Sequence, residues 1–412
     1  MQLYSTIVIG GGAAGLMAAG RAAERGAGVL LLEKMAQTGR KIGISGKGRC
    51  NLSNTAQLSD FINEFGRNGR FLRQALEQFS SGDLISFLKD RRLEVVVERG
   101  GRIFPKSGHA LEVVHLFNRW LAELQVQIEK DCPARSLIIN NSKICGVRCG
   151  EKEFPCSSAI LATGGKSYPR TGSTGDGYAL AAEAGHTITP LRPGLVPLVA
   201  NIRNNKSLAG LTLRNVKVRL YINSKRSGTE FGEMSFTQDG VSGPIILTLS
   251  GTIVDALAEK KDVTIMVDLK PALDERKLHA RLLRDFTNRR AEPIHSVLRG
   301  LLPGKLVELC IDSCDLEKDM LAREISAKTR TKLVQWLKGF TFDITGHRSW
   351  DEAIITAGGV NLAEINPRTM ESRLIPGLYI VGELLDISAN TGGYNLQAAF
   401  STGWLAGSSV AL

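Results

Sequence analysis

The N-terminal end of the chain carries the pattern that most limits its fold. A short apolar run, Thr6 to Ile9, leads into the turn Gly10-Gly11-Gly12-Ala13-Ala14-Gly15 and then into an alanine-rich stretch, Leu16 to Arg25. A second apolar run, Gly28 to Leu32, follows and ends in Glu33. This order predicts strand, glycine turn, helix and second strand, which is the start of a dinucleotide-binding fold.

Each position of the turn has a distinct role in such a fold. Gly10 permits the tight turn, Gly12 lets backbone approach a pyrophosphate, and Gly15 lets the helix pack on the strand. The first helical N–H groups, those of Ala13 and Ala14, have no partner inside the helix and can bind phosphate. An acid at the end of the second strand can accept hydrogen bonds from an adenosine ribose.

Two later strands indicate which dinucleotide is bound. Residues 158–162 form an apolar run that ends in Thr163-Gly164, and residues 377–381 form another that ends in Gly382-Glu383. A carboxylate at such a strand end can bind the hydroxyls of a ribityl chain, which FAD has and NAD lacks. The pattern favours a flavin; the alternative is two unrelated buried strands that end in glycine turns.

Composition limits the class of protein. A chain of 412 residues exceeds the size of one hydrophobic core, so we expect more than one domain. With 43% hydrophobic residues it is neither disordered nor collagen-like. We find no apolar run of roughly 20 residues and no secretory signal, which favours a cytoplasmic location. Seven scattered cysteines suit reduced thiols.

The charge is unusual, because the net value is +11. Residues 187–229 contain eight basic side chains and no acidic one, and residues 34–54 form a second acid-free basic segment. FAD phosphates can explain the second segment, whereas the first suits an RNA backbone. A plain solvated face is the alternative. The eight cations are Arg192, Arg203, Lys206, Arg214, Lys217, Arg219, Lys225 and Arg226.

Five sequence blocks together resemble the BaiN/RdsA family of FAD-dependent oxidoreductases. The two most specific are GRKIGISGKGRCNLSN from Gly39 and the long block that begins TAGGVNLAEINPRTMESRLIPGLYIVGELL at Thr356. The others are IVIGGGAAGLMAA, ILATGGKSYPRTGSTGDGYALAAEAGH and SFTQDGVSGPIIL. The resemblance implies an α/β fold with a Rossmann-like FAD-binding domain of the two-dinucleotide-domain flavoprotein type, interrupted by a β-rich, barrel-like insert and a helical insert.

The sequence supports a division into these parts. Residues 216–222 alternate with period 2, as in a strand, whereas residues 270–340 place apolar side chains at helical spacing. We therefore predict a discontinuous FAD-binding domain over 1–194 and 356–412. We predict a β-rich domain over 195–269 and 341–355, and a helical domain over 270–340.

The resemblance and the motifs together give a set of expected cofactor-binding residues. The loop Gly392 to Gln397 precedes an alanine-rich helix, and by resemblance it closes the site with Asn395 and Leu396 nearest the flavin ring. The full set is Gly10, Gly12, Ala13, Ala14, Gly15, Glu33, Lys34, Arg40, Lys41, Ser45, Gly46, Thr163, Gly164, Gly382, Glu383, Gly393, Asn395 and Leu396.

Cys50 is the candidate catalytic residue. It lies in the run Ser45 to Asn51, beside Lys47 and Arg49, and nearby cations favour a thiolate or tune a proton donor. The hypothesis is a general acid or a redox-active thiol, and the alternative is a small buried filler. The other cysteines have no zinc-like spacing, so we expect no metal.

The resemblance implies transfer of hydride from FAD to a C=C bond conjugated to a carbonyl. No second strand–glycine–helix unit occurs, so NAD(P)H would visit the flavin transiently as reductant. The basic insert favours uracil in ribosomal RNA as the substrate and dihydrouridine as the product. The alternatives are a small-molecule enone reductase, an amine oxidase that uses oxygen, and a non-catalytic flavin-dependent RNA-binding or redox-sensing protein. No histidine lies in a hydrolase motif.

Overall fold

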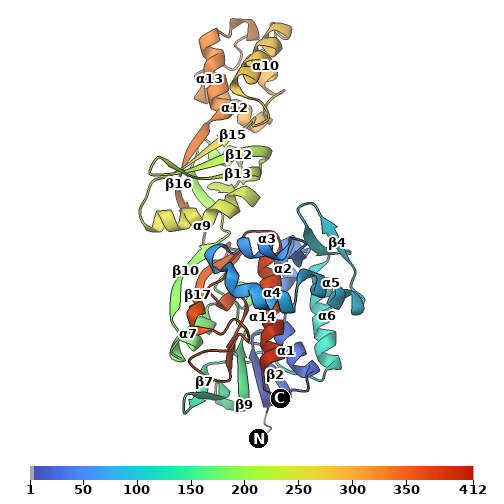
Figure 1. Cartoon of the computed structure of the whole chain (residues 1–412). Coiled ribbons are helices and arrows are strands. Elements are labelled where there is room, and N and C mark those ends of the chain that lie inside the picture. The colour runs from blue at the N-terminus through green and yellow to red at the C-terminus, as the bar shows by residue number, and fades with distance from the viewer. Residues whose placement is uncertain (1–3, 412) are drawn as a thin grey trace. The chain divides into compact units, whose positions relative to one another are not determined.

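A computed structural model describes residues 4–411, and its contacts divide the chain into two compact units. The first unit comprises the residues up to Gly194 together with those from Trp350 onward, and the second comprises Leu195–Ser349. Figure 1 shows both in ribbon form. Residues 350–355 thus belong to the first unit, while our division of the insert into a barrel module and a helical module stays a prediction.

A parallel sheet lies at the centre of the first unit. Its strands β6 (Gln127–Glu129), β2 (Val29–Leu32), β1 (Tyr4–Ile9), β9 (Lys152–Leu161) and β18 (Leu378–Ile380) pair side by side in that order, all parallel. The β2 strand and most of β1 are buried, which explains their continuous apolar runs. The predicted fold class is confirmed, because this is the strand order of a Rossmann-type sheet.

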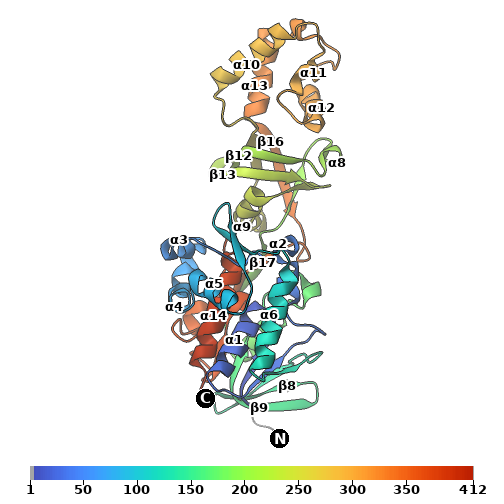
Figure 2. The ribbon, with the colours of Figure 1, turned by 90° about the vertical axis from the view of Figure 1, so that its right-hand side faces the viewer.

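Two helices from opposite ends of the chain pack against each other beside this sheet. They are α1 (Ala13–Glu24) and α14 (Tyr394–Ser409), which Figure 2 shows next to each other. Close approach requires glycine here, since a Cβ on Gly403 would lie 2.3 Å from the carbonyl oxygen of Ala14. The C-terminal segment is therefore part of the nucleotide-binding unit.

Smaller elements complete the first unit. Strands β7 (Ser136–Asn140) and β8 (Lys143–Cys149) extend the main sheet with antiparallel pairing. A three-stranded sheet contains β3 (Ser53–Asn54), β5 (Arg102–Pro105) and β4 (Val95–Glu98), and β10 (Ile188–Gly194) pairs with β17 (Ile355–Val360). The remaining α-helices are α2 (Arg40–Gly48), α3 (Leu58–Asn63), α4 (Arg73–Gln78), α5 (Ser81–Asp90), α6 (Ala110–Glu123) and α7 (Asp176–Glu183).

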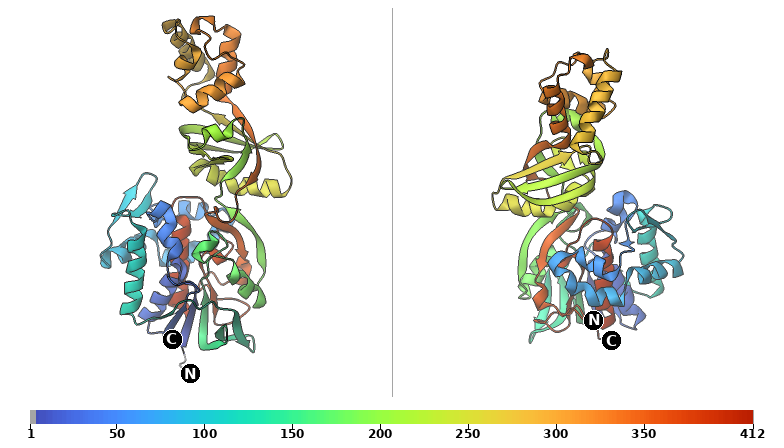
Figure 3. Two further views of the ribbon diagram at one scale, coloured as in Figure 1. Left: turned by 180° about the vertical axis from the view of Figure 1, so that it is seen from behind. Right: turned by 45° about the horizontal axis from the view of Figure 1, so that its top comes forward.

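The second unit contains a closed six-stranded barrel, visible in Figure 3. Alternate side chains of its strands are buried, as the period-2 pattern predicts. In pairing order the strands are β11 (Leu198–Asn201), β14 (Gly240–Ser242), β13 (Lys225–Phe236), β12 (Thr212–Ile222), β15 (Val263–Asp268) and β16 (Phe340–His347).

Helices accompany the barrel in this unit. The apolar helix α9 (Pro244–Ala258) packs against β13. The helical region that the spacing of apolar residues predicts is present. Of the apolar positions Leu278, Leu282, Leu283 and Phe286 in α10, Leu283 is exposed and the other three are buried. The α-helices of this region are α10 (Glu275–Asn288), α11 (Ile294–Leu298), α12 (Gly304–Ser313) and α13 (Ala327–Lys338), and a short α8 (Asn205–Leu208) follows β11. Within residues 4–411, no helix is both long and apolar enough to span a membrane.

Candidate active site: a dinucleotide cradle at the strand ends

The glycine turn lies where the direction of winding reverses, between the carboxyl ends of β1 and β9. A Cβ on Gly10 would lie 2.6 Å from the carbonyl oxygen of Ala162, at the end of β9. A Cβ on Gly15 would lie 1.8 Å from the carbonyl oxygen of Gly10. These close approaches leave no room for a side chain. The crevice at such a reversal is where open α/β sheets bind dinucleotides.

Gly12 has the opposite environment. A Cβ there would meet no heavy atom within 4 Å, so Gly12 faces open space. It is the N-cap of α1, and no side chain caps that helix. No capping side chain therefore accepts a hydrogen bond from the N–H groups of Ala13 and Ala14. These groups lie at the positive end of the helix dipole. The shape and charge of this cradle fit the pyrophosphate of FAD.

The side chain of Glu33 is buried beside the turn and accepts hydrogen bonds from two backbone N–H groups. Its Oε2 accepts a hydrogen bond from Gly11 N at 2.8 Å, and its Oε1 accepts one from Met35 N at 2.8 Å. Burial raises the pKa of this carboxyl, although the two N–H groups oppose the shift. Each carboxylate oxygen can accept a second hydrogen bond. The side chain is thus fixed where it could bind the ribose of an adenosine.

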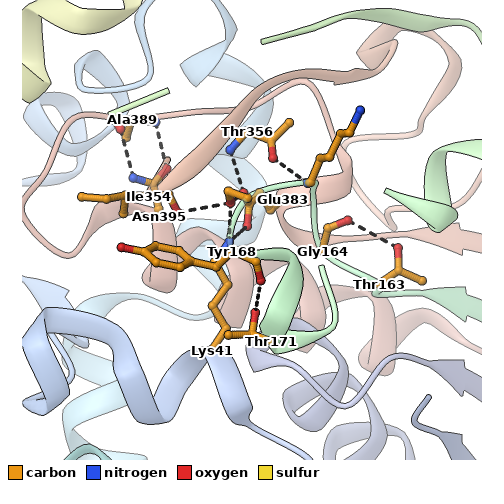
Figure 4. Close-up of polar contacts among 12 residues, drawn as sticks. Lys41, Thr163, Gly164, Tyr168, Thr171, Ile354, Thr356, Glu383, Ala389 and Asn395 are labelled. Carbon is orange, nitrogen blue, oxygen red and sulfur yellow. Dashed lines mark hydrogen bonds and ion pairs between the residues drawn. The ribbon is translucent and has the colours of Figure 1, made fainter. Parts of the chain in front are cut away.

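Glu383 is the centre of a second polar cluster, shown in Figure 4. Its Oε2 accepts a hydrogen bond from Lys41 Nζ at 2.7 Å, and its Oε1 accepts bonds from Ser167 Oγ at 2.8 Å and from Thr356 N at 2.7 Å. Burial alone would raise the pKa of Glu383, but the Lys41 charge and these hydrogen bonds outweigh it and hold the pKa below its usual value. The carboxylate is therefore ionised and fixed.

Gly382 connects this cluster to the cradle. Its φ of +68° is left-handed, and a Cβ on it would lie 2.9 Å from the Cβ of Ala14. Residues 382–383 therefore lie beside the start of α1, and the expected binding of ribityl hydroxyls by Glu383 stays a prediction. Sequence reasoning missed Ser167 and Thr356 as the partners that orient this carboxylate, although both lie in blocks that carry the family resemblance.

The expected cofactor residues of the adjoining loops already have protein partners. Lys34 Nζ donates to Asp176 Oδ2 at 2.8 Å, and Arg40 donates to a carbonyl oxygen, that of Arg170, at 3.0 Å. Thr163 Oγ1 lies 3.4 Å from the carbonyl oxygen of Gly164, which has a left-handed φ of +73°. Within residues 4–411, Lys34 thus pairs with a carboxylate, whereas Arg40 has no carboxylate within 4 Å.

The segment that contains Cys50 folds as a distorted end of α2. Ser45 leaves the helical conformation, and Gly46 and Lys47 are left-handed. Ser45 Oγ donates to the carbonyl oxygen of Ile42 at 2.8 Å, so its hydroxyl is used locally. A Cβ on Gly46 would lie 2.8 Å from Asn51 N, which explains the glycine. The segment is shaped by backbone contacts rather than by apolar packing.

Asn51, which sequence reasoning did not select, connects this segment to α14. With its amide oriented to satisfy both groups, its side-chain oxygen accepts a hydrogen bond from Gly393 N at 3.1 Å and its nitrogen donates to Ser53 O at 3.2 Å. A Cβ on Gly393 would lie only 2.2 Å from Ser53 O. Gly393 therefore brings the N-terminus of α14 against residues 51–53.

The side chain of Asn395 is held by hydrogen bonds to backbone groups. Its Oδ1 accepts from Ala389 N at 2.9 Å, and its Nδ2 donates to the carbonyl oxygens of Ala389 at 3.0 Å and Asn390 at 3.3 Å. The amide thus holds the loop before α14 (Figure 4). The backbone N–H of Asn395 and that of Leu396, in the first turn of α14, remain the groups that could face a flavin.

Two polar atoms beside the start of α14 are buried without a hydrogen-bond partner among residues 4–411. They are Ser53 Oγ and Gln397 Oε1. Gln397 otherwise donates to the carbonyl oxygen of Phe79 at 3.0 Å. Buried polar atoms normally have a partner, so unpaired ones next to a helix N-terminus are consistent with a site built for a ligand.

Cys50 is fully buried, and neither neighbouring cation stabilises a thiolate there. Arg49 instead forms an ion pair with Glu98 and lies over the ring of Phe104. Burial raises the pKa of Cys50 to about 12, against a smaller opposing effect of Ser45. Burial therefore keeps the thiol protonated near neutral pH, which favours a proton donor over a thiolate. A role as proton donor stays a prediction.

A Ser–His–Glu arrangement occurs that no sequence motif indicated. His186 Nδ1 lies 3.0 Å from Glu364 Oε2, and His186 Nε2 lies 2.9 Å from Ser372 Oγ. Ser372 Oγ also accepts hydrogen bonds from the N–H groups of Leu374 and Ile375. The serine oxygen is buried and its lone pairs are occupied, so it cannot attack a substrate. This cluster is structural.

Among residues 4–411 no group of three potential metal ligands occurs.

The chain matches known proteins over nearly its whole length. The family profile described as HI0933-like protein Rossmann domain matches residues 4–409. The chain is 34% identical over 406 residues to a 3-dehydro-bile acid delta(4,6)-reductase from Clostridium scindens, covering 98% of both chains. It is 29% identical over 417 residues to a ribosomal RNA dihydrouridine synthase from Haemophilus influenzae, covering 100% of this chain and 99% of the relative.

A solved structure supports the fold. Flavocytochrome c3 fumarate reductase in an open conformation superposes with a TM-score of 0.54 at 16% identity, covering 99% of this chain and 78% of that one. The glycine cradle, the two fixed carboxylates and these matches all agree with the resemblance drawn from the motifs. The chain belongs to the HI0933-like family, that of BaiN and RdsA, and is an oxidoreductase with a Rossmann-type FAD-binding domain.

Proposed function

We propose that this protein uses FAD, reduced by NAD(P)H, to reduce a C=C bond conjugated to a carbonyl, and that the substrate is a uracil base in ribosomal RNA. Two of the relatives are a 3-dehydro-bile acid delta(4,6)-reductase and a ribosomal RNA dihydrouridine synthase. Both names describe saturation of a C=C bond that is conjugated to a carbonyl. The shared chemistry is therefore the part of the proposal with the broadest support.

The reaction adds one hydride and one proton, that is two electrons and two protons. When bound and reduced by NAD(P)H, FAD would supply the hydride to the β carbon of the enone, and a proton must reach the α carbon. The chain contributes the uncapped start of α1 for the pyrophosphate, Glu33 for the adenosine ribose and the ionised Glu383 beside the cradle. Asn51 and Gly393 fix the N–H groups at the start of α14, where they would favour negative charge on a flavin pyrimidine edge.

Cys50 remains our candidate for the proton donor. Burial keeps its thiol protonated at neutral pH, as a donor must be. Its side chain is fully buried, so donation also requires the adjoining segment 45–49 to move and expose Sγ. We propose that NAD(P)H reduces the flavin and departs before the acceptor binds, which gives ping-pong kinetics.

One observation favours RNA over a small acceptor: the second unit exposes cations that no carboxylate neutralises. Lys225, for example, is exposed, and Lys217 on the same hairpin forms no ion pair within 4 Å among the described residues. A small-molecule reductase gains nothing from such a surface, whereas an enzyme that acts on ribosomal RNA needs to bind phosphates.

The test is mass spectrometry of ribosomal RNA from cells with and without this protein. We expect one uridine to be heavier by two hydrogens only when the protein is present. Identical RNA in the two strains would refute the RNA substrate. If the RNA of the two strains differs as expected, the purified holoprotein should also convert unmodified ribosomal RNA in vitro with NADPH or NADH.

A small-molecule enone reductase is the second candidate, and the 34% identity with the bile acid reductase favours it. Stopped-flow reoxidation separates these functions. Flavin reduced by NAD(P)H should be reoxidised rapidly by a steroid-like enone in this second case, and by uridine-containing RNA in the first. Rapid reoxidation by oxygen with an amine as the reductant would instead identify an amine oxidase. Absence of any turnover would leave the non-catalytic RNA-binding or redox-sensing role.

A further inference from the structure

The strands β12 and β13 of the barrel have two chemically different sides. Along β12, Val216, Val218 and Leu220 are buried, and Lys217 and Arg219 alternate with them at partial exposure. Leu220 pairs with Gly228 of β13, and a Cβ on Gly228 would lie 3.1 Å from Leu249 Cδ2 of α9. The side of the sheet that carries the buried apolar residues therefore faces α9. The period of 2 then places Lys217 and Arg219 on the side of the sheet facing away from α9.

An exposed aromatic ring lies on that same side. Phe231 of β13 pairs directly with Lys217 of β12, and Thr229 pairs with Arg219. The Phe231 side chain is 58% exposed, although a phenyl ring buried in a core would contribute favourably to stability. Tyr221 continues the row along β12 at partial exposure. We call Lys217, Arg219, Tyr221 and Phe231 the outer barrel patch.

Two acids near the patch already have cationic partners. Asp268, which is opposite Lys217 on β15, is buried and forms an ion pair with Lys338 at 2.7 Å. Glu233, the exposed acid further along β13, lies 3.8 Å from Arg214. Within residues 4–411, Lys217 has no carboxylate within 4 Å. Its charge therefore remains available to a partner.

We propose that the outer barrel patch binds a single-stranded segment of RNA, with a base stacked on Phe231 and phosphates on Lys217 and Arg219. Proteins that bind single strands combine a cationic surface with exposed aromatic rings, because every base offers a face for stacking. An acidic peptide would use the cations but would leave the ring without a partner. The inference rests on the proposed RNA substrate and adds the surface that binds the RNA and the single-stranded form of the segment.

The experiment measures fluorescence anisotropy of a labelled uridine-rich 12-nucleotide RNA with the full-length, FAD-loaded protein. We expect Phe231→Ala to weaken binding by roughly fivefold or more. Lys217→Ala should weaken binding and lower the slope of log affinity against log salt by about 0.7. Leu283→Ala is the matched control, since Leu283 of α10 in the same unit is 50% exposed and should leave affinity unchanged.

Two further measurements make the result decisive. A duplex of the same sequence should bind with little dependence on Phe231, because its bases are not open to stacking. Flavin absorbance and the melting temperature of each variant should match those of the wild type, which shows that the fold is intact. Wild-type affinity in folded Phe231→Ala would overturn the proposal. So would complete displacement of the RNA by a polyglutamate peptide at equal charge concentration.

The outcomes also separate this inference from the proposed function. If Phe231→Ala weakens binding but the wild-type protein leaves every uridine unreduced, the patch stands and the substrate proposal fails. If uridine gains two hydrogens while Phe231→Ala binds as tightly as the wild type, the substrate proposal stands and the patch fails.

Discussion

The two basic segments that contain no acidic residue differ in whether their cations form ion pairs with carboxylates in the folded protein. In the first unit, Lys34 forms an ion pair with Asp176 at 2.8 Å and Lys41 forms one with Glu383 at 2.7 Å. In the second unit, Lys217 has no carboxylate within 4 Å among the described residues, and Arg214 has one only at 3.8 Å. Two segments that are both basic in the sequence thus differ in the fold: carboxylates pair with several cations of the first, whereas Lys217 of the second stays unpaired within residues 4–411.

This difference changes the interpretation of the first segment. Its cations were expected to neutralise FAD phosphates, but protein carboxylates already pair with Lys34 and Lys41, and also with Arg49. Phosphate binding would then depend mainly on backbone N–H groups at the start of α1, as in other dinucleotide folds. In the second unit, cations such as Lys217 have no carboxylate within 4 Å among the described residues, so their charge faces outward unpaired.

The largest effect is expected at the glycine turn of the first unit, and it tests whether phosphate binding depends on the backbone N–H groups there. Gly15→Ala would put a Cβ 1.8 Å from the carbonyl oxygen of Gly10, so we expect destabilisation by about 2 kcal/mol or more and loss of bound flavin. Gly12→Ala is the matched change, because its Cβ meets no protein atom within 4 Å. We expect it to keep the apoprotein stable within about 0.5 kcal/mol but to weaken FAD binding at least tenfold.

Thermal unfolding of the apoproteins and titration with FAD, followed by flavin fluorescence, would measure both effects. If Gly12→Ala binds FAD as tightly as the wild type, the cradle does not hold the pyrophosphate, and the cations of the first unit return as candidates.

The next effect concerns the network around Glu383. Lys41→Met leaves a mostly buried carboxylate without its cation, since the side chains of Lys41 and Glu383 are 27% and 21% exposed. We expect a loss of about 2 kcal/mol at pH 7, less than for a fully buried pair. Because the folded pKa of Glu383 lies below its ordinary 4.5, this stabilisation is present above pH 4.5 and is lost as the pH falls through the lowered pKa.

The difference in unfolding free energy between wild type and Lys41→Met should therefore decrease in acid, as chemical denaturation at a series of pH values can show. Glu383→Gln in the same background should restore part of the loss. A difference that stays constant down to pH 3 would contradict the assignment of the network.

Cys50 gives a smaller effect with a different pH dependence. Cys50→Ala removes one buried sulfur and should cost about 1 kcal/mol near pH 7. Burial raises the folded pKa to about 12 from 9.0, so the neutral thiol contributes stability below pH 9 that is lost as the pH rises toward 12. The variant should lose less stability than the wild type over that interval.

Stopped-flow reoxidation of the reduced flavin by substrate separates this packing effect from catalysis. A proton donor predicts a much slower reoxidation in both Cys50→Ala and Cys50→Ser. An unchanged rate in the two folded variants would show that Cys50 is only a core residue.

The smallest effect is expected at Arg49, a cation of the same segment as Lys41 but on the surface. Its side chain is 45% exposed and pairs with Glu98. Exposed ion pairs contribute little to stability, so Arg49→Ala should shift the melting temperature by less than about 2 °C and leave the flavin spectrum unchanged. A shift as large as that of Lys41→Met would remove the distinction between buried and exposed cations within this unit.

The nucleotide-binding fold could be predicted from the sequence to a large extent. The runs Thr6–Ile9 and Gly28–Leu32 correspond to β1 and β2, and the alanine-rich stretch after Gly15 lies within α1. These features are local, since periodicity and glycine placement act over a few residues. The later strands at residues 158–162 and 377–381 were also found, as β9 and β18.

The orientation of single side chains could not be predicted in this way. No local pattern indicated that the amide of Asn395 holds the loop at Ala389. Asn51 and Ser167 were missed, because their roles depend on Gly393 and on Glu383, which are hundreds of residues away in the chain. His186 and Ser372 likewise meet only in the folded protein.

The sequence by itself therefore determined the fold class, the glycine cradle, the family and the position of surplus positive charge. Only the tertiary structure decided which cations are neutralised. Lys41 and Glu383 are 342 positions apart, yet their charged atoms lie 2.7 Å apart in a largely buried site. The physical reason is that Coulomb energy depends on distance in space and on burial, neither of which the position of a charge along the chain specifies.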